Sequence, residues 1–278
     1  MSARPFDAKA FARRAGFAGF AGLIGAFFAL PMLWLVFAPF NDRPTLAAKP
    51  SSPTLGNFRE VFERDDVLQA LRNSSILVVI SVAVVIAVGA PASYALSRIR
   101  FPGRDLFLYL LLLLSSVITG SASILPLFLL MYGLDLLNTF HGVSLALAGG
   151  LLPTSIFILK DFTDSIPRSY EESARVFGAS SFQALRHIVL PTIRPGLAVI
   201  AVWGAVQVWG NFLVPFILLR SADKSPAAVL MYSFYDEGGR ADLRAISAFA
   251  LVYTVPILLL YWFVNKRYGF RFHGGIKR

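Results

Sequence analysis

Cysteine is absent from this 278-residue chain, histidine occurs three times, and charged residues make up only 15% of it. Without cysteine there is no disulfide framework, no thiolate metal site and no cysteine nucleophile. No G-x-x-x-x-G-K-[ST] phosphate-binding loop is present either, so we expect no nucleotide chemistry in this chain. Soluble domains are about 25% charged, and the 56% share of hydrophobic residues indicates residence in a membrane instead.

Six long apolar segments dominate the sequence. A hydrocarbon core about 30 Å thick requires about 20 apolar residues in a helix, and this length is met by residues 17–38, 73–96, 106–131, 143–160, 196–219 and 244–264. The sequence therefore predicts an all-α integral membrane protein with six transmembrane helices. The basic N-terminus before the first segment resembles a signal peptide, but the apolar run is too long and lacks a small-residue cleavage site. We interpret it as a retained anchor.

Basic residues predict how the chain is oriented. One side receives 17 of the 26 Lys and Arg residues, and the side richer in basic residues is cytoplasmic. Both termini and the loop at 163–195 then face the cytoplasm, with tails at 1–16 and 266–278 around a membrane domain at 17–265. Because the +10 net charge is split into short clusters between apolar runs, it indicates membrane topology and no nucleic-acid partner.

Two loops fall on the opposite side, at residues 39–72 and 220–243. The first is long enough to contain a short helix within the segment FREVFERDDVLQALRN. That helix either lies along the membrane surface or is a solvated connector, and the sequence leaves both interpretations open.

No Asp, Glu, Lys, Arg or His falls in the interior of any predicted span. Ion-coupled carriers and proton pumps use intramembrane charged groups to bind or relay the ion. Intramembrane proteases need paired acids or histidine ligands at depth. The sequence therefore argues against these classes.

Neutral polar residues do occur within the predicted spans. Trp203, Gln207 and Asn211 in the fifth segment combine amide groups with an aromatic ring, which suits a passage for a hydroxyl-rich solute such as a sugar. Helix packing and interfacial anchoring explain the same residues equally well. The Ser and Thr residues at 115–123 are typical of helix packing and backbone hydrogen bonding.

The polar insert SIPRSYEESARVFGASSFQALRHIVLP, residues 165–191, separates the fourth and fifth segments. Ser169 and Glu172 have the S-x-x-E spacing of a capping box, which predicts a helix starting near Tyr170. Tyr170, Ala174 and Phe177 then share one apolar face. Adjacent helical residues point about 100° apart, so Glu171 and Glu172 do not converge as a catalytic pair.

A second short helix should follow a glycine turn. Gly178 supplies a C-cap for the first helix, Ser180 or Ser181 can cap the second, and Pro191 and Pro195 end or kink it. Two short amphipathic helices cannot bury their apolar faces alone. They dock into a partner, pack against the cytoplasmic ends of the chain's own spans, or lie on the membrane surface.

The insert resembles the EAA motif of permease subunits of binding-protein-dependent ABC importers. Glu172, Ser173 and Ala174 stand at the Glu-Ala-Ala positions, and Gly178 matches the glycine of the motif. Its hydrophobic-Leu-Pro ending is matched by Ile188, Leu190 and Pro191. The strings GLDLLNTFHG, VWGNFLVPF and KRYGFRFHGGIKR are similar to carbohydrate-uptake permeases, including the smaller permease of maltose transporters. Trp209-Gly210-Asn211-Phe212 departs from the Trp-Asn-Asp-Phe of such permeases.

That resemblance implies that the insert is a cytoplasmic coupling helix docking into an ATPase subunit. ATPase-coupling residues would be Tyr170, Glu171, Glu172, Ser173, Ala174, Phe177 and Gly178. The chain itself would be a transport subunit and no enzyme, without bound cofactors, because ATP and Mg²⁺ belong to the partner ATPase. Further implied partners are a second permease in a heterodimer, a homodimeric or paired ATPase, an extracytoplasmic solute-binding protein and the lipid of the bacterial cytoplasmic membrane.

The function predicted is import of a sugar or related polyhydroxylated solute. Within the same class, a polyamine, peptide or phosphate ester is the alternative cargo. From another class, a secondary carrier that acts alone remains open.

Overall fold

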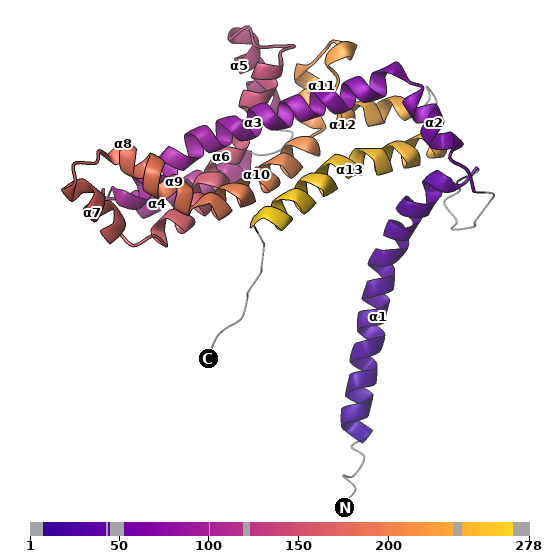
Figure 1. Ribbon diagram of the computed structural model, residues 1–278. Coiled ribbons are helices and arrows are strands. Elements are labelled where there is room, and N and C mark those ends of the chain that lie inside the picture. The colour runs from indigo at the N-terminus through magenta and orange to yellow at the C-terminus, as the bar shows by residue number, and fades with distance from the viewer. Residues whose placement is uncertain are drawn as a thin grey trace, which may run out of the picture. The chain divides into compact units, whose positions relative to one another are not determined.

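The computed structural model describes residues 8–42, 44, 53–99, 101–118, 123–235 and 241–268 (Figure 1). These ranges form helices and connecting turns, and no extended strand occurs within them. The helices, in chain order, are α1 (Ala8–Phe37), η1 (Ala38–Phe40), α2 (Gly56–Phe62), α3 (Asp65–Arg98), α4 (Arg104–Ile118), α5 (Ile124–Gly133), α6 (Phe140–Asp164), α7 (Ser169–Val176), α8 (Ser181–Ala184), η3 (Leu185–Val189), α9 (Leu190–Thr192), α10 (Arg194–Trp209), α11 (Leu213–Leu218), η4 (Ala222–Lys224), α12 (Ala227–Leu230), η5 (Met231–Phe234) and α13 (Leu243–Tyr268).

Four of the six predicted spans lie in helices that are long and apolar enough to cross a membrane: α1 with η1, α3, α6 and α13. The 106–131 segment contains two helices, α4 and α5, and residues 119–122 between them lie outside the described residues. The 196–219 segment is α10 followed by α11, with a break at residues 210–212. The described chain thus has four candidate spans, or five when the bent pair at 181–192 and 194–209 is taken as one.

The chain divides into two compact units. The smaller unit contains residues 1–64 and 234–252. In it the Asn57 amide donates to the carbonyl oxygens of Pro39 and Asn41, each at 2.8 Å. These bonds hold α2 to the end of α1 and η1. The short helix expected within residues 39–72 is therefore confirmed as α2, while the second half of the predicted segment is the start of α3.

The larger unit contains residues 65–233 and 253–278, and its centre is the packed set α3, α6 and α10. Small residues allow the close approach of α3 and α6, because Ser81, Ser93 and Ser155 are fully buried. A Cβ atom at Gly89 would lie 3.7 Å from Leu159. Helices inside membranes commonly associate through such small residues.

α3 begins at Asp65, eight residues before the predicted span. Asp65 and Asp66 occupy its first turn, where negative side chains stabilise the helix dipole. At about 1.5 Å per residue, the helix is about 51 Å long. It therefore extends beyond a hydrocarbon core of about 30 Å and carries polar residues at both ends.

The entry to α10 is bent. The helical segments at 181–192 and 194–209 meet at 74°, and the first of them contains η3, a π-helical turn. Pro191 and Pro195 lack the backbone N–H that would continue the helical ladder. The kink predicted at these prolines is confirmed.

Gly196→Val is expected to destabilise this junction. A Cβ atom on Gly196 would lie 2.6 and 2.7 Å from ring carbons of Phe162, and overpacking of this kind costs about 1–3 kcal/mol. Thermal unfolding of the purified protein should show a lower midpoint for the variant. Gly149→Ala is the control, since no atom lies within 4 Å of its added Cβ in the described chain. Equal midpoints for Gly196→Val and wild type would contradict the packing.

Candidate functional site

The insert between α6 and α10 forms two short helices, α7 and α8, at one end of the larger unit (Figure 1). The chain leaves α7 through a Schellman turn, in which Gly178 N donates to Arg175 O at 2.9 Å and Ala179 N to Ala174 O at 3.0 Å. Gly178 has φ +84°, a conformation that costs other L-residues about 1–2 kcal/mol. The predicted glycine C-cap is confirmed.

The capping box lies at the start of α8 and not at the start of α7. Ser180 N donates to Gln183 Oε1 at 2.8 Å, and Gln183 N donates to Ser180 Oγ at 3.2 Å. For α7 the capping prediction is wrong, since Arg168 is the N-cap and makes no side-chain cap. Arg168 already has helical φ and ψ, so Ser169 lies in the first turn of the helix and cannot cap it.

Glu171 is turned into the protein, with only 2% of its surface exposed. Its carboxylate accepts a hydrogen bond from Tyr94 Oη at 2.8 Å and one from Arg98 Nε at 2.7 Å. Both donors belong to the last turns of α3. The resemblance implies a coupling role for both acids of α7; in the structure Glu171 is buried and only Glu172 is exposed.

Arg98 joins three elements at this point. Besides Glu171 on α7, its guanidinium donates to the carbonyl oxygens of Thr163 and Ile166, each at 3.2 Å, at the end of α6. The Arg98 side chain is 10% exposed and that of Glu171 is 3% exposed. Charge-assisted hydrogen bonds at such burial are strong, so α7 is fixed to the ends of α3 and α6.

A second set of polar contacts surrounds this ion pair. Ser97 Oγ donates to the Asp164 carboxylate, which also pairs with Lys160 Nζ at 2.6 Å. Arg168 donates to the Ser97 carbonyl oxygen at 3.2 Å. The residue before α7 is therefore bound to the backbone of α3, in addition to the contact of Glu171 with α3 side chains.

Four large apolar side chains of the insert point away from the protein, and we call them the α7–α8 patch. Phe177 is 91% exposed and Val176 is 83% exposed, and the other two members are Tyr170 and Phe182. Ala174 is half-buried, whereas Glu172 and Ser173 are exposed beside the patch. An apolar patch bordered by polar residues marks an interaction site.

Trp203 and Gln207 lie four residues apart on α10 and so share one side of it, whereas Asn211 lies in the break between α10 and α11. Trp203 packs against the buried core, and Gln207 is exposed. Asn211 Oδ1 accepts from Val214 N at 3.1 Å, which connects the break between α10 and α11. A solute role for the three residues stays a prediction.

Two features are not predicted from the sequence. The first is the cluster of Tyr94, Arg98 and Glu171: in the sequence Arg98 is only one of the basic residues that indicate topology, and Tyr94 is part of a predicted span. Trp209 Nε1 donates to Tyr253 O at 3.1 Å while Tyr253 Oη donates to Trp209 O at 2.6 Å, a reciprocal pair between α10 and α13. The one available signal was the pair Glu171 and Glu172, since adjacent helical residues cannot both face the same partner.

Residues 87–269 match the family described as binding-protein-dependent transport system inner membrane component. The diacetylchitobiose uptake system permease protein of Streptomyces coelicolor is 31% identical, over 86% of this chain and 80% of the relative. The galactooligosaccharides transport system permease protein of Bacillus subtilis is 30% identical, over 86% of each. The trehalose transport system permease protein of Mycobacterium tuberculosis is 30% identical, over 92% of this chain and 95% of the relative.

Among solved structures, a chain of a bacterial ABC transporter involved in import of the acidic polysaccharide alginate has the same fold. Its TM-score is 0.79 at 20% identity, covering 95% of this chain and 99% of that one. A bacterial alginate ABC transporter in complex with an alginate pentasaccharide-bound periplasmic protein matches with a TM-score of 0.62 at 16% identity, over 93% and 94%.

Proposed function

Because the chain belongs to the family of binding-protein-dependent transport system inner membrane components, we propose that it is a permease subunit importing a sugar or related polyhydroxylated solute. Members of this family are transport subunits of the inner membrane and are not themselves enzymes. The relatives named above are uptake permeases for diacetylchitobiose, galactooligosaccharides and trehalose, which supports a saccharide as the cargo.

The membrane domain extends over residues 17–265 and crosses the bilayer six times in this proposal. α4 with α5 forms the third span, and α10 with α11 forms the fifth. Both termini, at 1–16 and 266–278, lie in the cytoplasm together with the coupling loop at 163–195. Support comes from α3: Asn73 and Arg98 are 25 residues apart, which corresponds to about 38 Å along a helix. The two ends of the larger unit thus fit opposite faces of the membrane.

The observation that carries the mechanism is an exposed patch on a firmly attached helix. The α7–α8 patch presents Phe177 and Tyr170 outward, beside Glu172 and Ser173. Behind it, Glu171 is paired with Arg98. An ATPase subunit docked on the patch would move α7, and the ion pair would carry that movement to α3 and α6. Packed elements with discrete arrangements transmit such motions.

The proposed assembly has four kinds of member. A second permease pairs with this chain, two ATPase subunits bind ATP and Mg²⁺ on the cytoplasmic side, and a solute-binding protein docks outside. The solved transporter in complex with a periplasmic protein supports the last of these partners.

Glu172→Lys tests the coupling role. The residue is exposed, so membrane insertion and protein amount should match wild type, while reversal of its charge should reduce ATP-driven saccharide uptake at least tenfold. Arg59→Glu is the control, because the Arg59 side chain is largely exposed and pairs only with Glu63 in the described chain. Full uptake by Glu172→Lys would contradict a coupling role.

The function itself is tested by uptake with an inactivated ATPase partner. Accumulation of a saccharide should stop. Uptake that persists and collapses with the ion gradient would overturn the importer in favour of a carrier that acts alone, and a complete transporter that accumulates only non-saccharide solutes would overturn the cargo.

A further inference from the structure

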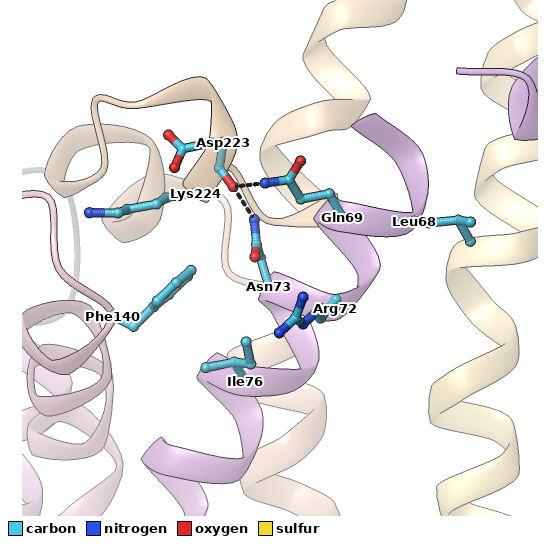
Figure 2. A pocket seen from close by; sticks show the side chains of 8 residues that line it. All are labelled: Leu68, Gln69, Arg72, Asn73, Ile76, Phe140, Asp223 and Lys224. Atoms are coloured by element: carbon cyan, nitrogen blue, oxygen red, sulfur yellow. Dashed lines mark hydrogen bonds between the residues drawn. The ribbon is translucent and has the colours of Figure 1, made fainter. Parts of the chain in front are cut away.

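A pocket of about 630 Å³ lies at the end of the larger unit opposite to α7, beside the first turns of α3 (Figure 2). Small-molecule sites commonly have volumes of about 300–1,000 Å³. Its walls come from α3, from the first residue of α6 and from η4; the lining residues are Leu68, Gln69, Arg72, Asn73, Ile76, Phe140, Asp223 and Lys224. By the proposed topology, the pocket opens on the outer side of the membrane.

The polar wall of this pocket is held in place by backbone contacts. Gln69 and Asn73 both donate to the Asp223 carbonyl oxygen, at 2.7 and 2.9 Å, as Figure 2 shows. Asn73 also donates to the Ser225 carbonyl oxygen at 3.0 Å. These contacts fix η4 against α3, so the pocket exists before any ligand arrives, which lowers the entropy cost of binding.

Asn138 fixes the other side. It has φ +56°, a conformation that Asn tolerates better than most residues. Its side-chain oxygen accepts from the backbone N–H groups of Arg220 and Ser221, each at 3.2 Å. Its carbonyl oxygen accepts from Lys224 Nζ at 2.8 Å. The turn before α6 therefore positions the ammonium group of Lys224 at the pocket.

Three charged groups of the pocket keep bonding capacity for a ligand. The Arg72 guanidinium, with five N–H donors, makes no hydrogen bond or ion pair with the part of the chain that the structure describes. Lys224 uses one of three donors. The Asp223 carboxylate is exposed at the rim and provides acceptors. Phe140 lies across from the α3 side chains (Figure 2) and offers an aromatic face.

We infer that this pocket is a saccharide-binding subsite, in which Arg72, Lys224 and Asp223 hydrogen-bond sugar hydroxyl groups and the Phe140 ring packs against the sugar's C–H face. This inference rests on the proposed function, and it assigns an outer contact for the cargo before it enters the spans. An acidic side chain of a docking protein would pair with the two cations, Arg72 and Lys224, and would need no other group of the pocket. The additional carboxylate, the aromatic wall and the volume fit a sugar ring better.

The test uses the full chain in lipid nanodiscs, titrated with trehalose, maltotriose and diacetylchitobiose, with binding followed by saturation-transfer NMR. Arg72→Gln removes the Arg72 cation without creating a cavity, and Phe140→Ala removes the ring. One or more of the sugars should bind wild type, and each variant should bind that sugar about tenfold more weakly, which corresponds to about 1.4 kcal/mol. Arg72→Gln loses a charge-assisted hydrogen bond, and Phe140→Ala loses the packing of the ring on the sugar.

Two control variants keep the result specific. Arg59→Gln removes an exposed arginine outside the pocket, and Tyr132→Ala removes an aromatic ring that is 69% exposed and does not line it. Both should bind the sugar as wild type does. Since Phe140 also packs against the core, Arg72→Gln decides the outcome should Phe140→Ala fail to fold.

Failure of the subsite and failure of the proposed function give different results. Suppose that the complete transporter accumulates a saccharide, that this saccharide does not bind the isolated chain, and that Arg72→Gln leaves its accumulation unchanged. The subsite is then overturned and the function stands. Weaker binding of the solute-binding protein by Arg72→Gln, with unchanged sugar binding, would overturn the subsite and assign the pocket to protein docking. If the complete transporter accumulates no saccharide at all, the proposed function falls, and the subsite with it.

Discussion

Arg98→Ala is expected to abolish ATP-driven uptake and to lower the stability of the protein. The substitution leaves the Glu171 carboxylate buried with its hydrogen-bonded cation removed, and breaking one partner of a buried ion pair costs about 3–5 kcal/mol. It also removes both hydrogen bonds to the end of α6. Thermal unfolding in detergent and uptake in cells measure the two effects, and Arg59→Ala should change either by little, because exposed pairs contribute about 0.2–1 kcal/mol.

A double-mutant cycle separates loss of the ion pair from general damage. Because Arg98 and Glu171 act on each other, Arg98→Ala combined with Glu171→Gln should be no less stable than Arg98→Ala alone. Arg98→Lys should restore part of the stability and little of the uptake. The planar guanidinium of arginine donates to α6 and α7 at the same time, and the compact ammonium group of lysine cannot. Strictly additive losses in stability would refute the pairing, and full uptake by Arg98→Ala would refute its role in transmitting motion.

Phe177→Ala is expected to uncouple transport without affecting the fold. The side chain is 91% exposed, so its removal creates no cavity. As the most exposed aromatic ring of the α7–α8 patch, it is the expected anchor of the interface, and truncating such an anchor costs 2 kcal/mol or more. That corresponds to about 30-fold weaker docking of the ATPase subunits.

Copurification of the ATPase subunits with the permease measures this loss directly. Tyr132→Ala is the matched control, because Tyr132 is 69% exposed and belongs to α5, outside the insert. The control should retain both the ATPase subunits and uptake. Wild-type retention of the ATPase subunits by Phe177→Ala would mean that the patch is not where they dock.

Some features of the protein are determined by local sequence. The apolar runs require membrane helices wherever they occur, since backbone polar groups in lipid must be paired within the segment. The turn at Gly178, the capping box at Ser180 and the kink at Pro191 and Pro195 depend on residues within a few positions of one another. Their physical cause lies within the local sequence. The glycine turn and the proline kink are predicted from it, and Ser180 is one of two predicted caps, whereas the capping box is predicted at Ser169 and found at Ser180.

Other features depend on residues far apart in the chain, and the tertiary structure alone decided them. Glu171 and Glu172 are the same residue type at adjacent positions; one is buried because Tyr94 and Arg98, 77 and 73 residues earlier, pack against its side of α7. The saccharide pocket likewise requires α3 to meet η4, 150 residues later. Periodicity places a side chain on a helix face, but only packing between helices determines which face is buried and which charge finds a partner.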